Sequence, residues 1–463
     1  MFDCFCDILL QAVKSFSLEK FESFEYNTRV LIKKFFLIDK FYLTAFAILI
    51  PTSINLSITQ FVTPLLNAIM GRTDNPAISI SSYSIAISIL LLIALPNLRI
   101  QHLTIVYYKN INKLKVHFFV ILISTICLFC SVLIIYTPVS NIFLEKIFFT
   151  EGDLRNNVEK CLKLGFYIPF LLIIKMHLYA VAIVSSKSSL IWAGTIFGFI
   201  CTFLLAIIFY LIGFEGFRLG ISAVAYSLAL ETLAIFMLVR NDLLDFKLKF
   251  TRDIVMVGDL FKFFTPLLFA AFIPSFTMPA INAVLTRLDN PEVSISAVNI
   301  GIGIFGAVSF SIYGCQSTIL SLMSNGYNYF KIRDFAYFVS FLTLFLCSFI
   351  AWINPVNHFI FNTIFNLDED LYKNTLLVFR LLSFLPPFLV MEQLYVGIIM
   401  NSKSTNPIIY INICRFLVLI IFLGASIFLL QNGPFVGGLA WSLTLFFEAI
   451  FAWLFGKNIK KPN

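Results

Sequence analysis

Charged residues are scarce in this 463-residue chain. Only 13% of its residues are charged and 59% are hydrophobic, whereas soluble domains average about 25% and 45–50%. The mean hydropathy of +0.92 is too high for a single soluble core to bury. The net charge of +8 comes largely from basic residues in short loops between apolar runs. We therefore expect an integral membrane protein that binds no nucleic acid.

Motifs of catalysis and cofactor binding are also missing. The sequence has no Walker A loop, no His-Glu-x-x-His pair and no supporting Ser/His/Asp set. Its four histidines are scattered, at His102, His117, His177 and His358. We expect no enzyme activity, no cofactor and no metal site. A transporter without an ATP site would draw on an ion or substrate gradient.

Apolar runs long enough to cross a bilayer, about 20 residues, recur from residue 41 to the C-terminus. They predict an all-α, polytopic protein with twelve transmembrane helices. The predicted spans are 41–70, 77–97, 116–137, 161–184, 188–212, 219–239, 259–286, 292–322, 335–354, 374–400, 406–430 and 434–456.

Loop charges predict the orientation, because Lys and Arg accumulate in cytoplasmic loops. Basic residues occupy the N-terminal segment, every second loop and the tail, whereas the alternate loops are acidic, as at Asp153 and Asp370. Both termini are therefore expected in the cytoplasm, in a bacterial inner membrane or a plasma membrane. Residues 1–40 lack a signal-peptide pattern. They fit both an amphipathic helix on the bilayer surface and a partly disordered tail.

The two halves of the chain repeat each other with an offset of about 215 residues. Segment 64–81 (PLLNA, then RTDNPAISIS) matches segment 279–296 (PAINA, then RLDNPEVSIS), and later matches keep the same order. Because each copy holds six spans, both enter the membrane in the same sense, as in transporters that rock one half against the other. We expect a monomer with these parts: N-lobe 41–240, cytoplasmic linker 241–258, C-lobe 259–457 and cytoplasmic tail 458–463.

Ionisable residues inside spans are costly and point to function. Lys175, Arg380 and Arg415 are basic, and Glu392 lies in the same span as Arg380. One interpretation is that the three bases line a central cavity beside Glu392 and bind an anion. The alternative is that they pair with Glu392 or with backbone carbonyls, or extend to an interface. Since bases outnumber acids within the spans, the sequence favours a small anionic solute.

Polar residues at repeat-equivalent positions form a second set of candidates. Asn67 and Asn282 are predicted either to form interhelical hydrogen bonds or to contact substrate, and Tyr83 is predicted on the first-lobe wall. Arg72 and Arg287, at the outer ends of spans one and seven, are expected in a structural or an outer-gate role.

Two further carboxylates, Glu231 in span six and Glu448 in span twelve, lie at similar depths in the two halves. We regard them as candidates for binding a coupling ion, H⁺ or Na⁺.

Short motifs over residues 41–457 resemble the MOP flippase superfamily, which includes the MATE multidrug exporters. They are Leu66-Asn67 with Ser82-Tyr83-Ser84, Pro279-Ala-Ile-Asn282 with Arg287 and Tyr313-Gly314, and Arg380-Leu-Leu-Ser383-Phe384-Leu-Pro386 with Arg415. The resemblance implies a MATE-like fold of two six-helix lobes around a V-shaped cavity. Within the superfamily the chain is most similar to the progressive ankylosis (ANK) family, whose animal members are linked to export of pyrophosphate, citrate and nucleotides. It lacks their long polar C-terminal tail.

The leading hypothesis is a secondary-active or facilitative exporter of small organic or phosphate-bearing anions. One alternative is a flippase for a lipid-linked pyrophosphate. The other is a MATE-type multidrug/cation antiporter. Against it, span 41–70 contains no Asp or Glu, whereas such exporters typically bury a carboxylate there.

Overall fold

The computed structural model describes residues 40–108, 113–185, 187, 189–244, 257–324, 326–402, 406–429 and 432–457. These residues are almost entirely helical, and no strand occurs among them. The predicted N-terminal segment up to residue 39, most of the linker and the tail lie outside the described residues.

The first half of the chain forms a series of long helices joined by short turns. Its elements are α3 (Lys40–Met70), α4 (Pro76–Ala94), η1 (Leu95–Arg99), α5 (Ile100–Tyr107), α6 (Lys113–Tyr136), α7 (Val139–Asn141), η2 (Ile142–Ile147), α8 (Gly152–Gly165), α9 (Ile168–Val184), α10 (Ser189–Leu211) and α11 (Gly216–Leu244).

The second half repeats the same order. Its elements are α12 (Val257–Ser275), α13 (Thr277–Leu285), α14 (Pro291–Val308), α15 (Phe310–Tyr313), α16 (Cys315–Ser324), α17 (Tyr329–Trp352), α18 (Asn354–His358), η3 (Phe359–Ile364), α19 (Glu369–Leu382), α20 (Pro386–Asn401), α21 (Asn406–Leu429) and α22 (Gly433–Gly456). Even the π-helical turns η2 and η3 correspond, and each is followed by a residue with positive φ, Phe149 at 46° and Asn366 at 54°.

The apolar helices fit a multi-pass membrane protein. Among the described residues, nine helices are long and apolar enough to span a bilayer. Two pairs bent by 45° bring the number to eleven if each pair is one span: Val257–Phe269 with Ala271–Leu285, and α19 with α20. The 31-residue α3 occupies the position of the first predicted span. The predicted all-α, multi-pass architecture is thus confirmed, and the count of twelve is consistent with the structure.

One predicted span differs from a continuous helix. Residues 292–322 are divided into α14, α15 and α16, with breaks at Ser309 and Gly314. A Cβ on Gly314 would lie 3.1 Å from the backbone nitrogen of Ser53. The break therefore lets α3 approach the C-lobe backbone closely.

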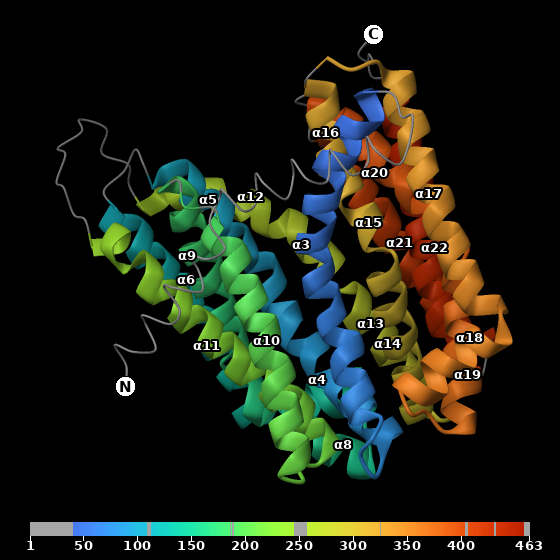
Figure 1. Cartoon of the computed structure of the whole chain (residues 1–463). Coiled ribbons are helices and arrows are strands. Elements are labelled where there is room, and N and C mark those ends of the chain that lie inside the picture. Colours follow the sequence, from blue (N-terminus) through green and yellow to red (C-terminus); the bar gives the residue numbers. More distant parts are fainter. Residues whose placement is uncertain are drawn as a thin grey trace.

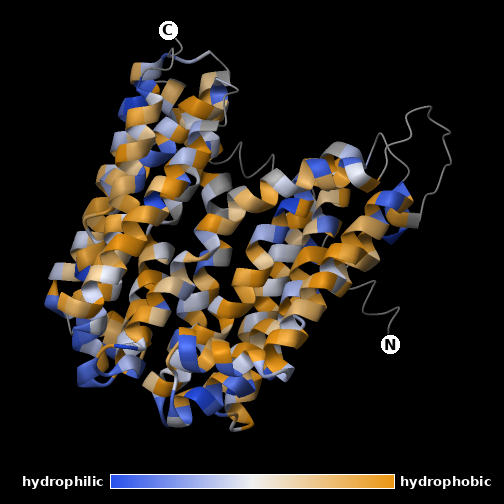
Figure 2. Cartoon of the chain, turned by 180° about the vertical axis from the view of Figure 1, so that it is seen from behind, coloured by the Kyte–Doolittle hydropathy of each residue, from blue (hydrophilic) through white to orange (hydrophobic). Residues whose placement is uncertain are grey.

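The helices form two lobes that meet at one end and diverge at the other (Figure 1). They meet around α8 and α19 and diverge toward α5 and α16. Hydrophobic residues dominate the middle of both lobes, and hydrophilic residues collect at the ends (Figure 2). The described helix ends that flank the predicted cytoplasmic loops, such as the ends of α5 and α20, lie at the diverging end (Figure 1). In the predicted orientation this end would be the cytoplasmic one.

The first helix of each half begins against the opposite lobe. Near the start of α3, the Phe46 ring lies 5.2 Å from that of Phe335 on α17. Near the start of α12, the Phe261 ring lies 4.8 Å from that of Phe119 on α6. Each lobe therefore contacts the first helix of the other half, and these contacts hold the two lobes together.

Loop accessibility will test the orientation. In a cysteine-free background, a cysteine at Glu215 should react with an impermeant maleimide in intact cells, because the α10–α11 turn is predicted to be external. A cysteine at Asn328, before α17, should react only after permeabilisation. The opposite pattern would show that the positive loops face outward.

Candidate functional site

A cavity of about 540 Å³ lies between the lobes. Its walls come mainly from α3, α4, α9, α10 and α11, and Met278, Asn299 and Trp441 contribute from the C-lobe. Most lining side chains are apolar or carry hydroxyl groups, and Lys175 and Glu231 are the charged ones. The predicted Tyr83 lies in this wall and is buried.

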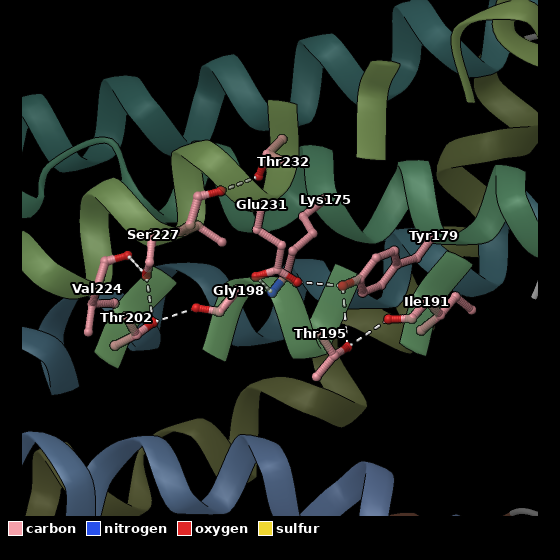
Figure 3. A network of polar contacts seen from close by, with 11 residues as sticks. Lys175, Tyr179, Ile191, Thr195, Gly198, Thr202, Val224, Ser227, Glu231 and Thr232 are labelled. Atoms are coloured by element: carbon pink, nitrogen blue, oxygen red, sulfur yellow. Dashed lines mark hydrogen bonds and ion pairs between the residues drawn. The ribbon is translucent and has the colours of Figure 1, made fainter. Parts of the chain in front are cut away.

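Lys175 and Glu231 form an ion pair in the cavity wall (Figure 3). The Lys175 Nζ lies 3.2 Å from Glu231 Oε2, and the Tyr179 hydroxyl donates to Glu231 Oε1 at 2.5 Å. Tyr179 also lies 3.4 Å from the Thr195 hydroxyl. Both charged side chains are largely buried, with 15% and 9% of their surfaces exposed. Because the pair is buried, loss of either side chain would leave the charge of the other uncompensated.

Local sequence makes room for this carboxylate. Gly198 on α10 faces Glu231 so closely that any Cβ there would overlap the carboxyl group. One turn further on, Thr202 donates to Ser227 at 2.8 Å and joins α10 to α11 beside the pair. The glycine thus leaves the space that the Glu231 carboxylate occupies in the cavity wall.

The C-lobe holds a second buried pair. Arg415 on α21 binds both oxygens of Glu448 on α22, at 2.9 and 2.8 Å, and donates to the Thr277 hydroxyl at 3.3 Å. Glu392 on α20 accepts a hydrogen bond from Gln393 and lies near enough to interact electrostatically with Glu448 and Arg415. Arg415 is thus paired with Glu448, and a second carboxylate lies near the pair.

Arg380 lies apart from both pairs. Its Nε donates to the Ala351 carbonyl at 3.2 Å, and its guanidinium stacks 4.9 Å from the Trp352 ring at the outer end of α17. The structure thus brings Lys175 to the cavity and places Arg415 and Arg380 elsewhere. Substrate binding by these residues remains a prediction.

The two predicted asparagines form reciprocal bridges between lobes. Asn67 on α3 accepts from the Asn299 amide of α14 at 3.3 Å. Asn282 on α13 donates to Ser84 and Ser88 of α4, at 3.4 and 3.3 Å. Both asparagines are fully buried. The interhelical hydrogen bonds use the Asn67 side-chain oxygen and the Asn282 side-chain nitrogen, whereas Asn67 Nδ2 and Asn282 Oδ1 have no hydrogen-bond partner among the described residues.

Arg72 and Arg287 also cross between lobes, at the outer end. Arg72 donates to the carbonyls of Ala68, in its own helix, and of Thr363 in η3, the latter at 3.3 Å. Arg287 likewise donates to Ala283 and, at 3.2 Å, to the carbonyl of Lys146 in η2. The cross-lobe hydrogen bonds of both arginines thus end on backbone carbonyls.

The same end is reinforced by the residues with positive φ. The Arg287 guanidinium lies 4.0 Å from the Phe149 ring centre, and Asn366 donates to the Gly71 carbonyl at 3.2 Å. A Cβ on Gly71 would overlap the Phe365 carbonyl. We call Gly71, Arg72, Arg287, Phe149 and Asn366 the outer clasp, because the predicted orientation places this end on the outside.

Sequence reasoning missed one buried polar chain. His117 on α6 and His177 on α9 are 2.9 Å apart, and His177 also lies 2.9 Å from the Thr104 hydroxyl. These residues are separated by 60 and 73 positions, and no motif connects them. Among the described residues, no cluster of three or more metal-binding side chains occurs.

No protein-family model matches the chain, and no curated protein matches it in sequence. Solved structures match over most of its length. An inward-facing multidrug resistance MATE family transporter of the MOP superfamily has a TM-score of 0.64, 14% identity and coverage of 90% of this chain and 97% of its own. Lipid II flippase MurJ, in an inward closed conformation, has a TM-score of 0.65, 14% identity and 88% coverage of both. The chain has a MATE-like fold.

Other MATE-like structures agree with this assignment. A MOP superfamily transporter from Pyrococcus furiosus has a TM-score of 0.54 at 15% identity, covering 89% of this chain and 95% of its own. Identities this low show the fold alone, and the finer resemblance to the ANK family stays a prediction. An outward-facing MATE transporter has a TM-score of 0.53 at 16% identity, covering 89% of this chain and 95% of its own.

The Arg415–Glu448 pair can be tested by stability. Glu448→Ala should lower the free energy of unfolding by about 3–5 kcal/mol, because it leaves a buried guanidinium without its carboxylate. Thermal denaturation in detergent will measure the effect. Arg415→Met combined with Glu448→Leu should recover most of the loss. Equal destabilisation by the single and the double variant would show that packing, not charge pairing, dominates.

Proposed function

We propose that this MATE-like chain is a secondary-active transporter that moves small organic or phosphate-bearing anions by rocking its two lobes. The observation that carries the proposal is Lys175, the base of the cavity wall, held by Glu231 at 3.2 Å. An ammonium group with one carboxylate partner can exchange that partner for an anionic substrate. Hydroxyl groups of Tyr179, Thr195 and Thr202 around the pair supply further donors.

Protonation of Glu231 is the step that frees Lys175. With Glu231 ionised, an incoming anion competes with a partner already in place. With Glu231 neutral, Lys175 is an uncompensated charge inside the membrane, and binding an anion relieves that cost. Substrate and proton would therefore bind together.

The C-lobe cluster supplies a second place for ion coupling. Glu392, Glu448 and Arg415 carry a net charge of −1 when all are ionised, which is unfavourable in a buried site. A proton or Na⁺ bound there restores neutrality. This cluster lies in the C-lobe and the Lys175–Glu231 pair lies in the N-lobe. Binding of an ion to the first and of substrate to the second can therefore shift the equilibrium between the two orientations of the lobes.

The same cavity could serve a cationic solute if Glu231, not Lys175, were the binding group. The similarity to a multidrug MATE transporter supports this second candidate. A lysine 3.2 Å from the carboxylate opposes it, because a cation would have to displace Lys175 and then remain beside it.

Transport assays separate these cases. In proteoliposomes, Lys175→Met should lower uptake of labelled pyrophosphate, citrate or ATP by about 10- to 100-fold, the equivalent of one lost charge-assisted hydrogen bond. Glu231→Gln should retain anion exchange but lose accumulation driven by a proton gradient.

Lys187→Met, at an exposed lysine paired with Asp242, is the matched control. Uptake of a cationic dye that is abolished by Glu231→Gln and unharmed by Lys175→Met would overturn the anion assignment.

We further propose that the outer clasp is the external gate of the transport cycle. Gly71→Ala should raise the outward-open population about 5- to 10-fold, because the methyl group displaces contacts worth about 1 kcal/mol or more. Spin-label distances between exposed, repeat-equivalent positions Asn156 and Lys373 will report the change in a cysteine-free background. Gly424→Ala, where an added Cβ meets no atom within 4 Å, is the control. An unchanged distance distribution in Gly71→Ala would refute the gate.

A further inference from the structure

A second large hollow lies on the outer half of the N-lobe, away from the central cavity. It has a volume of about 720 Å³ between α8, the end of α10 and the start of α11. We call it the α8–α11 groove. Its lining residues are Lys160, Lys163, Leu164, Phe209, Phe214, Arg218, Ser222 and Tyr226.

The groove has a basic mouth. Lys163 pairs with Glu159 at 2.6 Å and Arg218 with Glu215 at 2.8 Å, both on the exposed surface. Lys160 lies 5.7 Å from the Phe217 ring, and no carboxylate of the described residues forms a salt bridge with it. The five charges therefore sum to +1, and the two surface pairs are weak enough to exchange partners with an incoming anion.

Aromatic rings form the deeper wall. Phe209 and Phe214 stack at 4.8 Å with only 9° between their planes, and the Tyr226 ring lies 6.0 Å from Phe209. Beside them, Leu211 and Ile212 expose 76% and 66% of their surfaces. In a membrane protein such exposure indicates contact with lipid chains, so the groove opens toward the bilayer.

An occupant of this groove must match both parts. Basic side chains at the end of apolar helices lie at headgroup depth, where they attract anionic lipids, and the aromatic wall suits an acyl chain. We infer that the α8–α11 groove binds an anionic phospholipid of the outward-facing leaflet, with its phosphate at Lys160, Lys163 and Arg218 and one chain along Phe209 and Tyr226.

The described part of the C-lobe shows no equivalent basic mouth. The repeat counterpart of Lys163 is Arg380, whose guanidinium is already held by the Ala351 carbonyl and the Trp352 ring. A hollow at the same end of the C-lobe is lined by Asp289 and by uncharged residues such as Asn290 and Val293. A lipid phosphate would therefore bind at this end of the N-lobe and not at the corresponding end of the C-lobe. Such a lipid would contact only the N-lobe side of the outer clasp.

Native mass spectrometry of the purified protein, titrated with phosphatidylglycerol or phosphatidylcholine, tests the inference. The wild type should bind one phosphatidylglycerol in preference to phosphatidylcholine. Combined Lys160→Gln, Lys163→Gln and Arg218→Gln should weaken it about 100-fold, at about fivefold for each basic residue near an anionic headgroup. Tyr226→Ala should also weaken phosphatidylglycerol binding, because the acyl chain of the lipid loses part of the aromatic wall that it packs against.

The matched control removes three exposed bases elsewhere, as Lys262→Gln, Arg333→Gln and Lys373→Gln, and should leave the affinity unchanged. All variants must remain monodisperse. Equal loss in the control, equal binding of phosphatidylcholine, or displacement of the lipid by inorganic phosphate would each overturn the inference. None of these outcomes depends on the transported substrate, so the proposed function is tested separately.

Discussion

The cost of placing charge inside a membrane governs this molecule. A bilayer offers buried ions no water, so each charge must be neutralised by another side chain or by a bound ion. Lys175 with Glu231 and Arg415 with Glu448 satisfy this requirement, one pair in each lobe. The cavity wall can therefore hold a base that is stable without substrate and that becomes available when its partner is neutralised.

The two lobes meet this requirement with different side chains. In the N-lobe, Lys175 of α9 pairs with Glu231 of α11 across from Gly198 on α10. In the C-lobe, Arg415 of α21 pairs with Glu448 of α22, and Glu392 of α20 lies near that pair. The first lobe therefore holds a neutral pair beside the cavity, whereas the second holds a pair with an additional carboxylate nearby.

The fold was largely predictable from the sequence, because apolar runs of bilayer length have few alternatives to helix and the PLLNA and PAINA segments reveal the repeat. The pairing of side chains was not. Lys175 and Glu231 are 56 residues apart, and nothing in the spacing indicates which helix faces meet. Similarly, Arg72 has Asp74 two residues away, yet its cross-lobe partner is a carbonyl in a π-helical turn, which hydropathy cannot show.

The reciprocal arrangement of the interface is expected to make separation of the lobes cooperative at the end where they meet. Arg72 donates to η3 of the C-lobe while Arg287 donates to η2 of the N-lobe. Asn67 and Asn282 bridge the lobes deeper in the interface, both through donors of the C-lobe. Because each lobe both donates and accepts across the same seam, separating the lobes breaks both sets of contacts together. Repeat symmetry therefore favours an all-or-none opening, which is what a carrier requires if its two sides are not to be open at once.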